Sequence, residues 1–135
     1  MNTVFADTSA FIALYDRRDK YHARAKIALK RIRKQKVRLV TTDYVFDETL
    51  TSILYALGYR TAVTVGDALL NSNVVEVAFT ERELKEEAWR LFKEYGAMKC
   101  SFTDCTSFAY MKQKSLAHAF TFDEDFKKAG FQLWV

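Results

Sequence analysis

Residues 3–16 decide the fold, and they read TVFADTSAFIALYD. The run Thr3–Ala6 is typical of a short buried strand, and the acidic residue Asp7 follows it directly. Phe11 and Ile12 then begin a pattern typical of a helix. A buried strand that ends on a carboxylate is costly unless something pairs with that carboxylate. The segment therefore predicts a strand, a functional or capping acid, and a helix in that order.

Further apolar runs repeat this alternation along the chain. They are VRLVT at residues 37–41, VVEVAF at 74–79, AFTF at 119–122 and QLWV at 132–135. Helical patterns separate most of these runs, which favours a parallel sheet with helices on its faces. The chain has 135 residues, no proline and four glycines, so it suits one compact domain over residues 1–135. We expect a single α/β domain.

Two helices have recognisable ends. Residues 80–96 read TERELKEEAWRLFKEYG, which predicts a capping box between Thr80 and Glu83 and an end at Gly96. Residues 41–58 read TTDYVFDETLTSILYALG and end at Gly58. The apolar side of this second helix consists of Phe46, Leu50, Ile53, Leu54 and Leu57.

The charge of the chain suggests a nucleic-acid partner. The formal net charge is +4, the sequence pI is about 9.1, and the basic residues concentrate between Arg24 and Arg38. Such a cluster is suited to phosphate contacts. An amphipathic helix with solvated charges explains the same pattern, because apolar residues recur at helical spacing within it. Both interpretations stay open at this point.

The N-terminus and the cysteines exclude several classes of protein. The first apolar run has no basic leader and is interrupted by Asp7, which fits neither a signal peptide nor a membrane span, so we expect a cytoplasmic protein without a membrane segment. Cys100 and Cys105 form no CxxC motif, which argues against a structural zinc site or a disulfide framework. We expect both to be small buried hydrophobic residues.

Two acids follow predicted strands. Asp7 comes after Thr3–Ala6, and Asp123 comes after AFTF. Ligands of open parallel sheets bind at the carboxyl ends of the strands, which makes both acids candidates for a site. The alternative for Asp7 is an N-cap of the next helix. For Asp123 the alternative is a solvated turn, and Asp125 is a second candidate for its role.

Two more candidates lie on helices. Asp104 follows Ser101 by three residues, so a capping box competes with a functional role. Glu48 lies off the apolar side of its helix, and the helical pattern alone does not separate it from Asp47. Several carboxylates brought together repel one another and need cations to stay ionised. Mg²⁺ or Mn²⁺ fits an oxygen-only ligand set and indicates metal-assisted phosphodiester chemistry.

Three blocks of the chain resemble the PIN-domain family and, within it, the small VapC-type toxins of toxin–antitoxin pairs. The blocks are VFADTSAFIALYDRRDKYHARA at residues 4–25, TTDYVFDETLTSIL at 41–54 and SFTDCTSFAYMKQKSLAHAFTFDEDFKKAGF at 101–131. The resemblance covers nearly the whole chain. It assigns the four acidic positions of the family to Asp7, Glu48, Asp104 and Asp123.

The resemblance implies both an architecture and an activity. It implies a central parallel sheet of about five strands flanked by helices, commonly in a homodimer. It also implies a Mg²⁺- or Mn²⁺-dependent endoribonuclease, with RNA as substrate and an antitoxin protein as partner. In this scheme the four acids bind metal and are catalytic, and Ser9 orients a water or a ligand. Asp125 stays in reserve as an alternative fourth acid.

Other functions compete with this one. A housekeeping RNA-processing nuclease would carry the same acids, and a binding module would hold RNA through the basic helix without cutting it. His22 could be mistaken for a general base, but a lone histidine near a helix start is more often a packing or capping residue.

Overall fold

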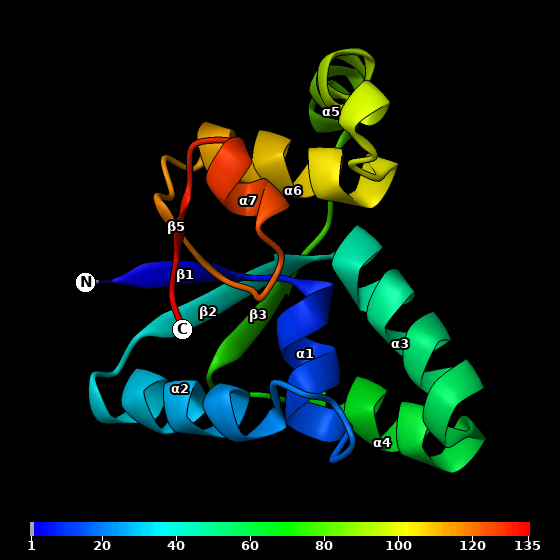
Figure 1. The fold of residues 1–135 in the computed structure, drawn as a ribbon, viewed down its shortest axis with the longest axis vertical. Helices are drawn as coiled ribbons and strands as arrows, with labels where there is room; N and C mark the ends of the chain where they lie inside the picture. Colours follow the sequence, from blue (N-terminus) through cyan, green and yellow to red (C-terminus); the bar gives the residue numbers. More distant parts are fainter. Residues whose placement is uncertain (1) are drawn as a thin grey trace.

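Five parallel strands form the centre of the fold (Figure 1). The computed structural model describes residues 2–135. The strands are β1 (Thr3–Ala6), β2 (Arg38–Thr42), β3 (Val75–Ala78), β4 (His118–Phe120) and β5 (Gln132–Leu133). Their order in the sheet is β3-β2-β1-β4-β5, and every neighbouring pair is parallel. The prediction of an α/β fold with a parallel sheet of about five strands flanked by helices is confirmed.

Helices cover both faces of the sheet. They are α1 (Thr8–Tyr15), α2 (His22–Lys34), α3 (Asp43–Leu57), α4 (Tyr59–Leu70), α5 (Arg82–Tyr95), α6 (Phe102–Gln113) and α7 (Asp125–Lys128), with a 3₁₀ turn at Gly96–Met98. In Figure 1, α1 and α2 lie below the strands, and α6 and α7 lie above them. This two-sided cover explains why the strand segments read as continuous apolar runs.

The central strand β1 anchors the core. Its residues Val4, Phe5 and Ala6 are at most 1% exposed. Phe5 pairs with Val40 on β2 and with Ala119 on β4. Because the strands are parallel, the residues that follow β1, β2 and β4 meet at one edge of the sheet.

Helices α3 and α5 end at the glycines that the sequence predicted as their ends. Gly58 separates α3 from α4 with a φ of 94°, a conformation that residues with a side chain rarely adopt. Gly96 caps the end of α5. Both predicted stops are confirmed.

The capping box predicted for α5 is wrong. The helix begins at Arg82, and its N-cap residue Glu81 makes no side-chain capping bond. Thr80 instead donates its backbone N–H and its hydroxyl to the carboxylate of Asp43, at 3.0 and 3.3 Å. Thr80 therefore binds the carboxylate of Asp43 on α3 and not Glu83, its predicted partner in the capping box.

The apolar side of α3 points only partly to the core. Ile53 is 1% exposed, whereas Leu54 is 41% exposed. Phe46 and Leu50 pack against α4, where a Cβ placed on Gly66 would lie 3.4 Å from Leu50 and 3.8 Å from Phe46. The apolar side of α3 therefore packs partly against α4 and partly against the core.

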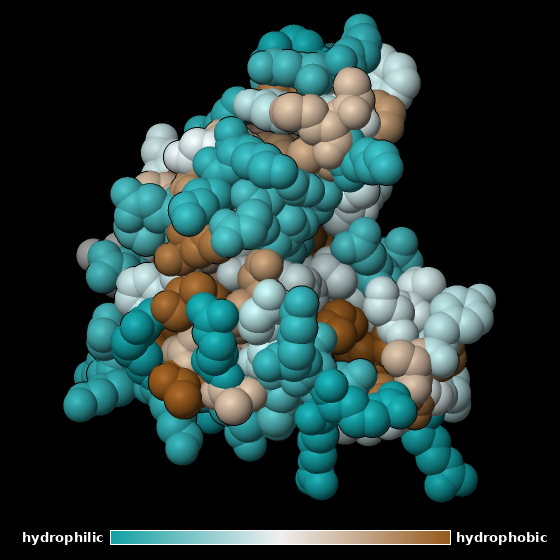
Figure 2. All heavy atoms as spheres, viewed as in Figure 1, coloured by the Kyte–Doolittle hydropathy of each residue, from teal (hydrophilic) through white to brown (hydrophobic). Residues whose placement is uncertain are grey.

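The hydropathy of the surface follows these layers. In Figure 2, hydrophilic side chains project along the lower margin, where Figure 1 places α2, the turn between α1 and α2, and α4. Among residues 2–135, no helix is both long enough and apolar enough to span a membrane. Cys100 and Cys105 are buried free thiols, as expected.

Candidate metal centre

Asp7 lies where β1 ends and α1 begins. Its backbone N–H donates to the carbonyl of Phe120 on β4 at 3.1 Å, and its side chain accepts from the backbone N–H of Ser9. The carboxylate therefore caps α1, which confirms the capping alternative. The residue is only 3% exposed and nevertheless borders the edge where β1 and β4 end. The two roles considered for Asp7 are thus compatible.

Two hydroxyl groups hold the Asp7 carboxylate. Thr121 and Ser9 donate to the Asp7 Oδ2 atom at 2.9 and 3.1 Å, and the two hydroxyl oxygens lie 3.0 Å apart. Ser9 Oγ also accepts from the backbone N–H of Phe122 at 2.9 Å, and Thr121 Oγ1 accepts from that of Asp123 at 3.0 Å. This network joins the end of β1 to the loop after β4.

Thr121 is a residue that the sequence pattern did not single out. It is fully buried, and β4 ends one residue before it, at Phe120. The predicted strand AFTF is therefore too long, because the chain turns at Thr121 to reach Asp7. The signal that could have identified Thr121 is a polar residue between two phenylalanines at the end of a predicted strand.

Asp104 opens helix α6 in a complete capping box. Its backbone N–H donates to Ser101 Oγ at 3.0 Å, and its Oδ2 accepts from the backbone N–H of Ser101 at 2.9 Å. The capping alternative is confirmed here as well. The capping bond involves one carboxylate oxygen, so the second oxygen is available for another ligand.

The four acids of the sequence prediction share one electrostatic environment. Burial and then the charge of Asp104 raise the pKa of Asp7 to about 7, and the Thr121 hydroxyl partly counters this. Burial raises the pKa of Asp104 to about 6, with further increases from Asp123 and Glu48. Burial is also the largest cause of the raised pKa of Asp123. The fold thus brings together carboxylates from the junction of β1 and α1, from α3, from α6 and from the loop after β4.

Glu48 and Asp47 differ in their position on α3. Glu48 is half-buried and its charge acts on Asp104, whereas Asp47 is exposed. This position favours Glu48, the residue to which the sequence blocks also pointed.

Asp125 lies in a neighbouring group. Its backbone N–H donates to Asp123 Oδ1 at 2.9 Å, and its own carboxylate lies 3.6 Å from Lys128 Nζ. Ligand atoms of Asp125, Asp104 and Cys100 lie within 4.8 Å of one another, close enough to hold a metal ion. Burial, followed by the charges of Asp125 and Asp104, raises the pKa of the Cys100 thiol to about 11. A protonated thiol is a weak ligand, so the carboxylates remain the main donors.

The donor set of this centre fits a hard divalent cation. Carboxylate oxygens are the ligands that Mg²⁺ and Mn²⁺ prefer, and a nearby cation would offset both the burial and the repulsion that raise these pKa values. Histidine takes no part in it.

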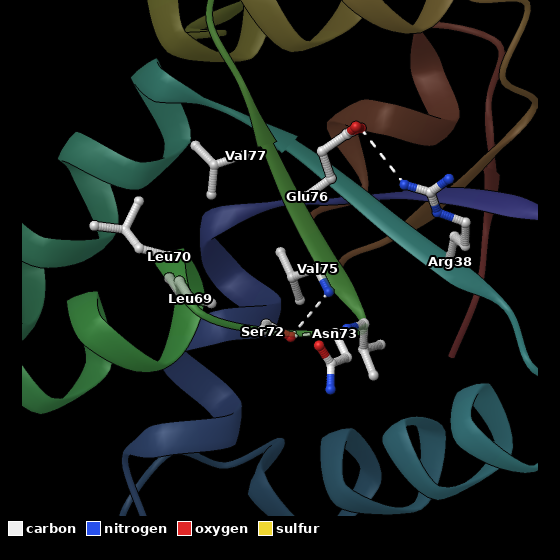
Figure 3. Close-up of a pocket in the computed structure, with 9 residues that line it drawn as sticks. Arg38, Leu69, Leu70, Ser72, Asn73, Val75, Glu76 and Val77 are labelled. Carbon is white, nitrogen blue, oxygen red and sulfur yellow. Dashed lines mark hydrogen bonds and ion pairs between the residues drawn. The ribbon is translucent and has the colours of Figure 1, made fainter.

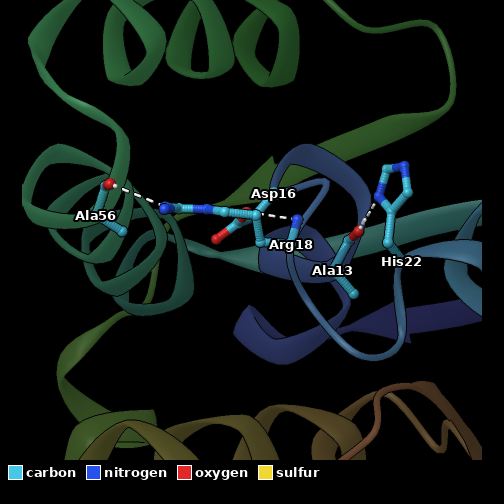
Figure 4. A network of polar contacts seen from close by, with 5 residues as sticks. All are labelled: Ala13, Asp16, Arg18, His22 and Ala56. Carbon is cyan, nitrogen blue, oxygen red and sulfur yellow. Dashed lines mark hydrogen bonds and ion pairs between the residues drawn. The ribbon is translucent and has the colours of Figure 1, made fainter.

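His22 has a structural role. Figure 4 shows its ring directed at Ala13, and its Nδ1 atom lies 2.7 Å from the Ala13 carbonyl oxygen. In the same network, Asp16 Oδ1 accepts from the backbone N–H of Arg18 at 2.9 Å. These contacts secure the turn between α1 and α2.

A hollow elsewhere on the surface offers no comparable chemistry. Figure 3 shows it at β3. Its volume is about 330 Å³. Arg38 and Glu76 form an ion pair there at 3.7 Å, and apolar residues such as Leu69 make up part of the remaining wall. The single carboxylate in this wall is already paired.

Comparison with known proteins shows similarity along nearly the whole chain. The PIN domain model matches residues 4–132. The chain is 37% identical over 129 residues to the 23S rRNA-specific endonuclease VapC20 of Mycobacterium tuberculosis, covering 95% of each chain. The crystal structure of VapC20, described as a sarcin-ricin loop cleaving toxin, superposes with a TM-score of 0.84 at 36% identity and covers 95% of both chains.

A more distant structure shares the fold alone. The VapBC2 structure from Rickettsia felis, bound to a promoter DNA fragment, has a TM-score of 0.68 at 11% identity and covers 97% of this chain and 96% of that one.

Proposed function

The chain belongs to the PIN-domain family, and from this premise we propose that it is a divalent-metal-dependent endoribonuclease, the toxin of a type II toxin–antitoxin pair. One observation supports the proposal: Asp7, Glu48, Asp104 and Asp123 share one partly buried environment, in which burial and, after it, neighbouring carboxylates raise the pKa of Asp7, Asp104 and Asp123. Such a group is stable in its ionised form only next to cations.

The proposed cofactor is Mg²⁺ or Mn²⁺. When bound, a divalent ion supplies an activated water and stabilises the leaving oxygen of a phosphodiester. Asp7, Glu48, Asp104 and Asp123 would hold it, directly or through water. Ser9 and Thr121 keep the Asp7 carboxylate in one orientation through their hydroxyl groups. Asp125 is the alternative to Asp123, since its carboxylate lies close to Asp104.

The proposed substrate is RNA. The similarity to VapC20 makes the sarcin-ricin loop of 23S rRNA the first substrate to test. We further propose an antitoxin protein as partner, a homodimer as the assembly, and the cytoplasm as the location. A housekeeping nuclease remains the second candidate, since it would need the same acids.

Cleavage of RNA with matched acid variants tests this proposal. We expect cleavage with Mg²⁺ or Mn²⁺, none with EDTA, and none from Asp7→Asn or Glu48→Gln. Asp47→Asn is the matched control, because Asp47 is adjacent to Glu48 but exposed, and it should cleave like the wild type.

Two results would contradict the proposal. Cleavage that survives Asp7→Asn unchanged would refute the metal site. RNA that binds without cleavage under all metal conditions would identify a binding module instead.

A further inference from the structure

An aromatic pair adjoins the acidic centre. Tyr21, the residue before α2, and Phe122, in the loop after β4, stack with centroids 4.5 Å apart and ring planes at 4°. Phe122 lies between Thr121 and Asp123 in the chain, and its backbone N–H donates to Ser9 Oγ at 2.9 Å. The pair is therefore fixed to the same network that holds Asp7.

Two cations flank this pair. The Arg24 guanidinium lies 5.6 Å from the Tyr21 centroid and 5.4 Å from the Phe122 centroid. Because these distances are nearly equal, Arg24 occupies the shared edge of the two rings. Lys20 Nζ lies 5.0 Å from the Tyr21 centroid. Within residues 2–135, the ion pairs at 4.0 Å or less include neither cation.

An RNA strand must overcome a repulsive field to reach the acids. Its phosphates carry negative charge, and four carboxylates line the centre. Unpaired cations beside the centre would attract the backbone, and an aromatic ring offers a surface on which any base can stack. Tyr21, Phe122, Arg24 and Lys20 combine both properties, and Phe122 directly precedes Asp123 in the chain.

We propose that Tyr21 and Phe122 form a stacking platform for an unpaired nucleobase of the RNA substrate, while Arg24 and Lys20 bind the adjacent phosphates. This inference rests on the proposed function and extends it, because it names the part of the chain that positions the RNA. It also gives a function to the basic residues at the start of α2, whose N-cap residue is Tyr21.

The same helix provides a matched control. Arg33 lies nine residues after Arg24, which is two and a half helical turns and hence the opposite side of α2. Burial raises the pKa of Tyr15 on α1, and Arg33 counters part of that rise, which places Arg33 near α1. Arg24→Gln and Arg33→Gln remove the same charge from the same helix, so they separate local contact from overall charge.

Binding is measured in the Asp7→Asn background, by fluorescence anisotropy of a labelled single-stranded RNA oligonucleotide. We expect Tyr21→Leu and Arg24→Gln to weaken binding by about tenfold or more, as for the loss of a stacking residue. Arg24→Gln should also lower the salt dependence of log Kd by about 0.7. Arg33→Gln should bind within about twofold of its parent, since salt largely screens an exposed charge on the opposite side of the helix.

Two further measurements separate stacking from folding. Tyr21→Trp keeps an aromatic face and should restore binding, while thermal unfolding reports whether Tyr21→Leu is folded. The fluorescence of an RNA that carries 2-aminopurine should fall when the base stacks on Tyr21 of the Asp7→Asn protein. It should not fall when the same RNA binds the variant that also carries Tyr21→Leu.

The outcomes distinguish this inference from the proposed function. If Tyr21→Leu and Arg24→Gln bind RNA as tightly as Arg33→Gln, the platform is overturned, and metal-dependent cleavage by the wild type still supports the nuclease. If these variants keep RNA binding but lose an antitoxin, the pair is a protein contact and the inference is wrong. If the wild type neither binds nor cuts RNA, both proposals fall.

Discussion

Burial governs the chemistry of Asp7. Its carboxylate is 3% exposed, and its pKa is raised to about 7 by burial and by the charge of Asp104. Hydroxyl groups of Ser9 and Thr121 favour the ionised form, but they do not outweigh burial. At the scale of single residues, the protonation of Asp7 should therefore affect both the stability of the fold and the rate of cleavage.

Without metal, the raised pKa of Asp7 should make the free energy of unfolding depend on pH. Because the folded chain binds the Asp7 proton more tightly than the unfolded chain, the free energy of unfolding should fall as pH rises from about 4 to about 7. Asp7→Asn removes this penalty, so with EDTA its stability relative to the wild type should increase with pH by up to about 4 kcal/mol. Urea denaturation at both ends of this pH range measures the difference. A difference that does not change with pH would show that Asp7 is not the titrating group.

The hydrogen bond from Thr121 should favour the ionised form of Asp7 during cleavage. Its hydroxyl lowers the pKa of Asp7, so Thr121→Val should raise that pKa further and move the acid limb of the cleavage profile to higher pH. Loss of a hydrogen bond to a charged group should also slow cleavage by about tenfold. Rates are measured against pH at limiting Mg²⁺. Thr121→Ser keeps the hydroxyl and should behave like the wild type, whereas an unchanged profile for Thr121→Val would argue against its positioning role.

At the scale of elements, one helix start serves two purposes. The capping box of Ser101 and Asp104 begins α6, and the same Asp104 carboxylate lies in the field of Asp123 and Glu48. The cap fixes the side chain in place before any metal binds. A site on a helix start is thereby more rigid than one on a free loop.

Matched substitutions should separate the two purposes. Ser101→Ala removes the hydroxyl cap and should lower the free energy of unfolding by about 1 kcal/mol. Cleavage should persist, because the backbone N–H of Ser101 still donates to Asp104. Asp104→Asn keeps an acceptor for the cap but removes the charge, so it should stay folded and lose cleavage. Urea denaturation measures the stability of both variants, and cleavage rates measure their activity. If Asp104→Asn is destabilised but still cleaves RNA, Asp104 serves the cap alone.

At the scale of the whole molecule, the helical hairpin of α3 and α4 exposes apolar side chains. Figure 2 shows brown patches on the right, where Figure 1 places these helices. The exposed apolar residues of the hairpin are Leu54, Tyr55, Tyr59, Val63 and Leu70. Apolar surface of this kind is usual at protein–protein interfaces, which supports the proposed homodimer.

Charge placed on this surface should dissociate the dimer. Leu54 and Val63 are 41% and 43% exposed, so Leu54→Glu or Val63→Glu should leave the core intact. Light scattering after size exclusion should show a dimer for the wild type and a monomer for these variants. Ile27→Glu on α2 is the control, because Ile27 is 67% exposed and outside the hairpin. A wild type that is monomeric at every concentration would refute the homodimer.

Local rules predicted the order of the elements and the ends of two helices, but not the end of β4 or the start of α5. Strand runs and the stops at Gly58 and Gly96 depend on a few neighbouring residues, so the sequence alone determined them. It also placed Asp7 at a strand end, where capping and a functional role proved compatible. The family resemblance then selected Glu48 over Asp47, a choice that helical spacing left open.

Only the tertiary structure decided what depends on distant partners. The strand order puts β4 beside β1, and this contact brings Thr121 and Phe122 to Asp7 and Ser9. The capping box at Thr80 failed for the same reason, since a carboxylate from α3 took its place. Periodicity and caps act over a few residues, whereas a shared pocket depends on which strands become neighbours.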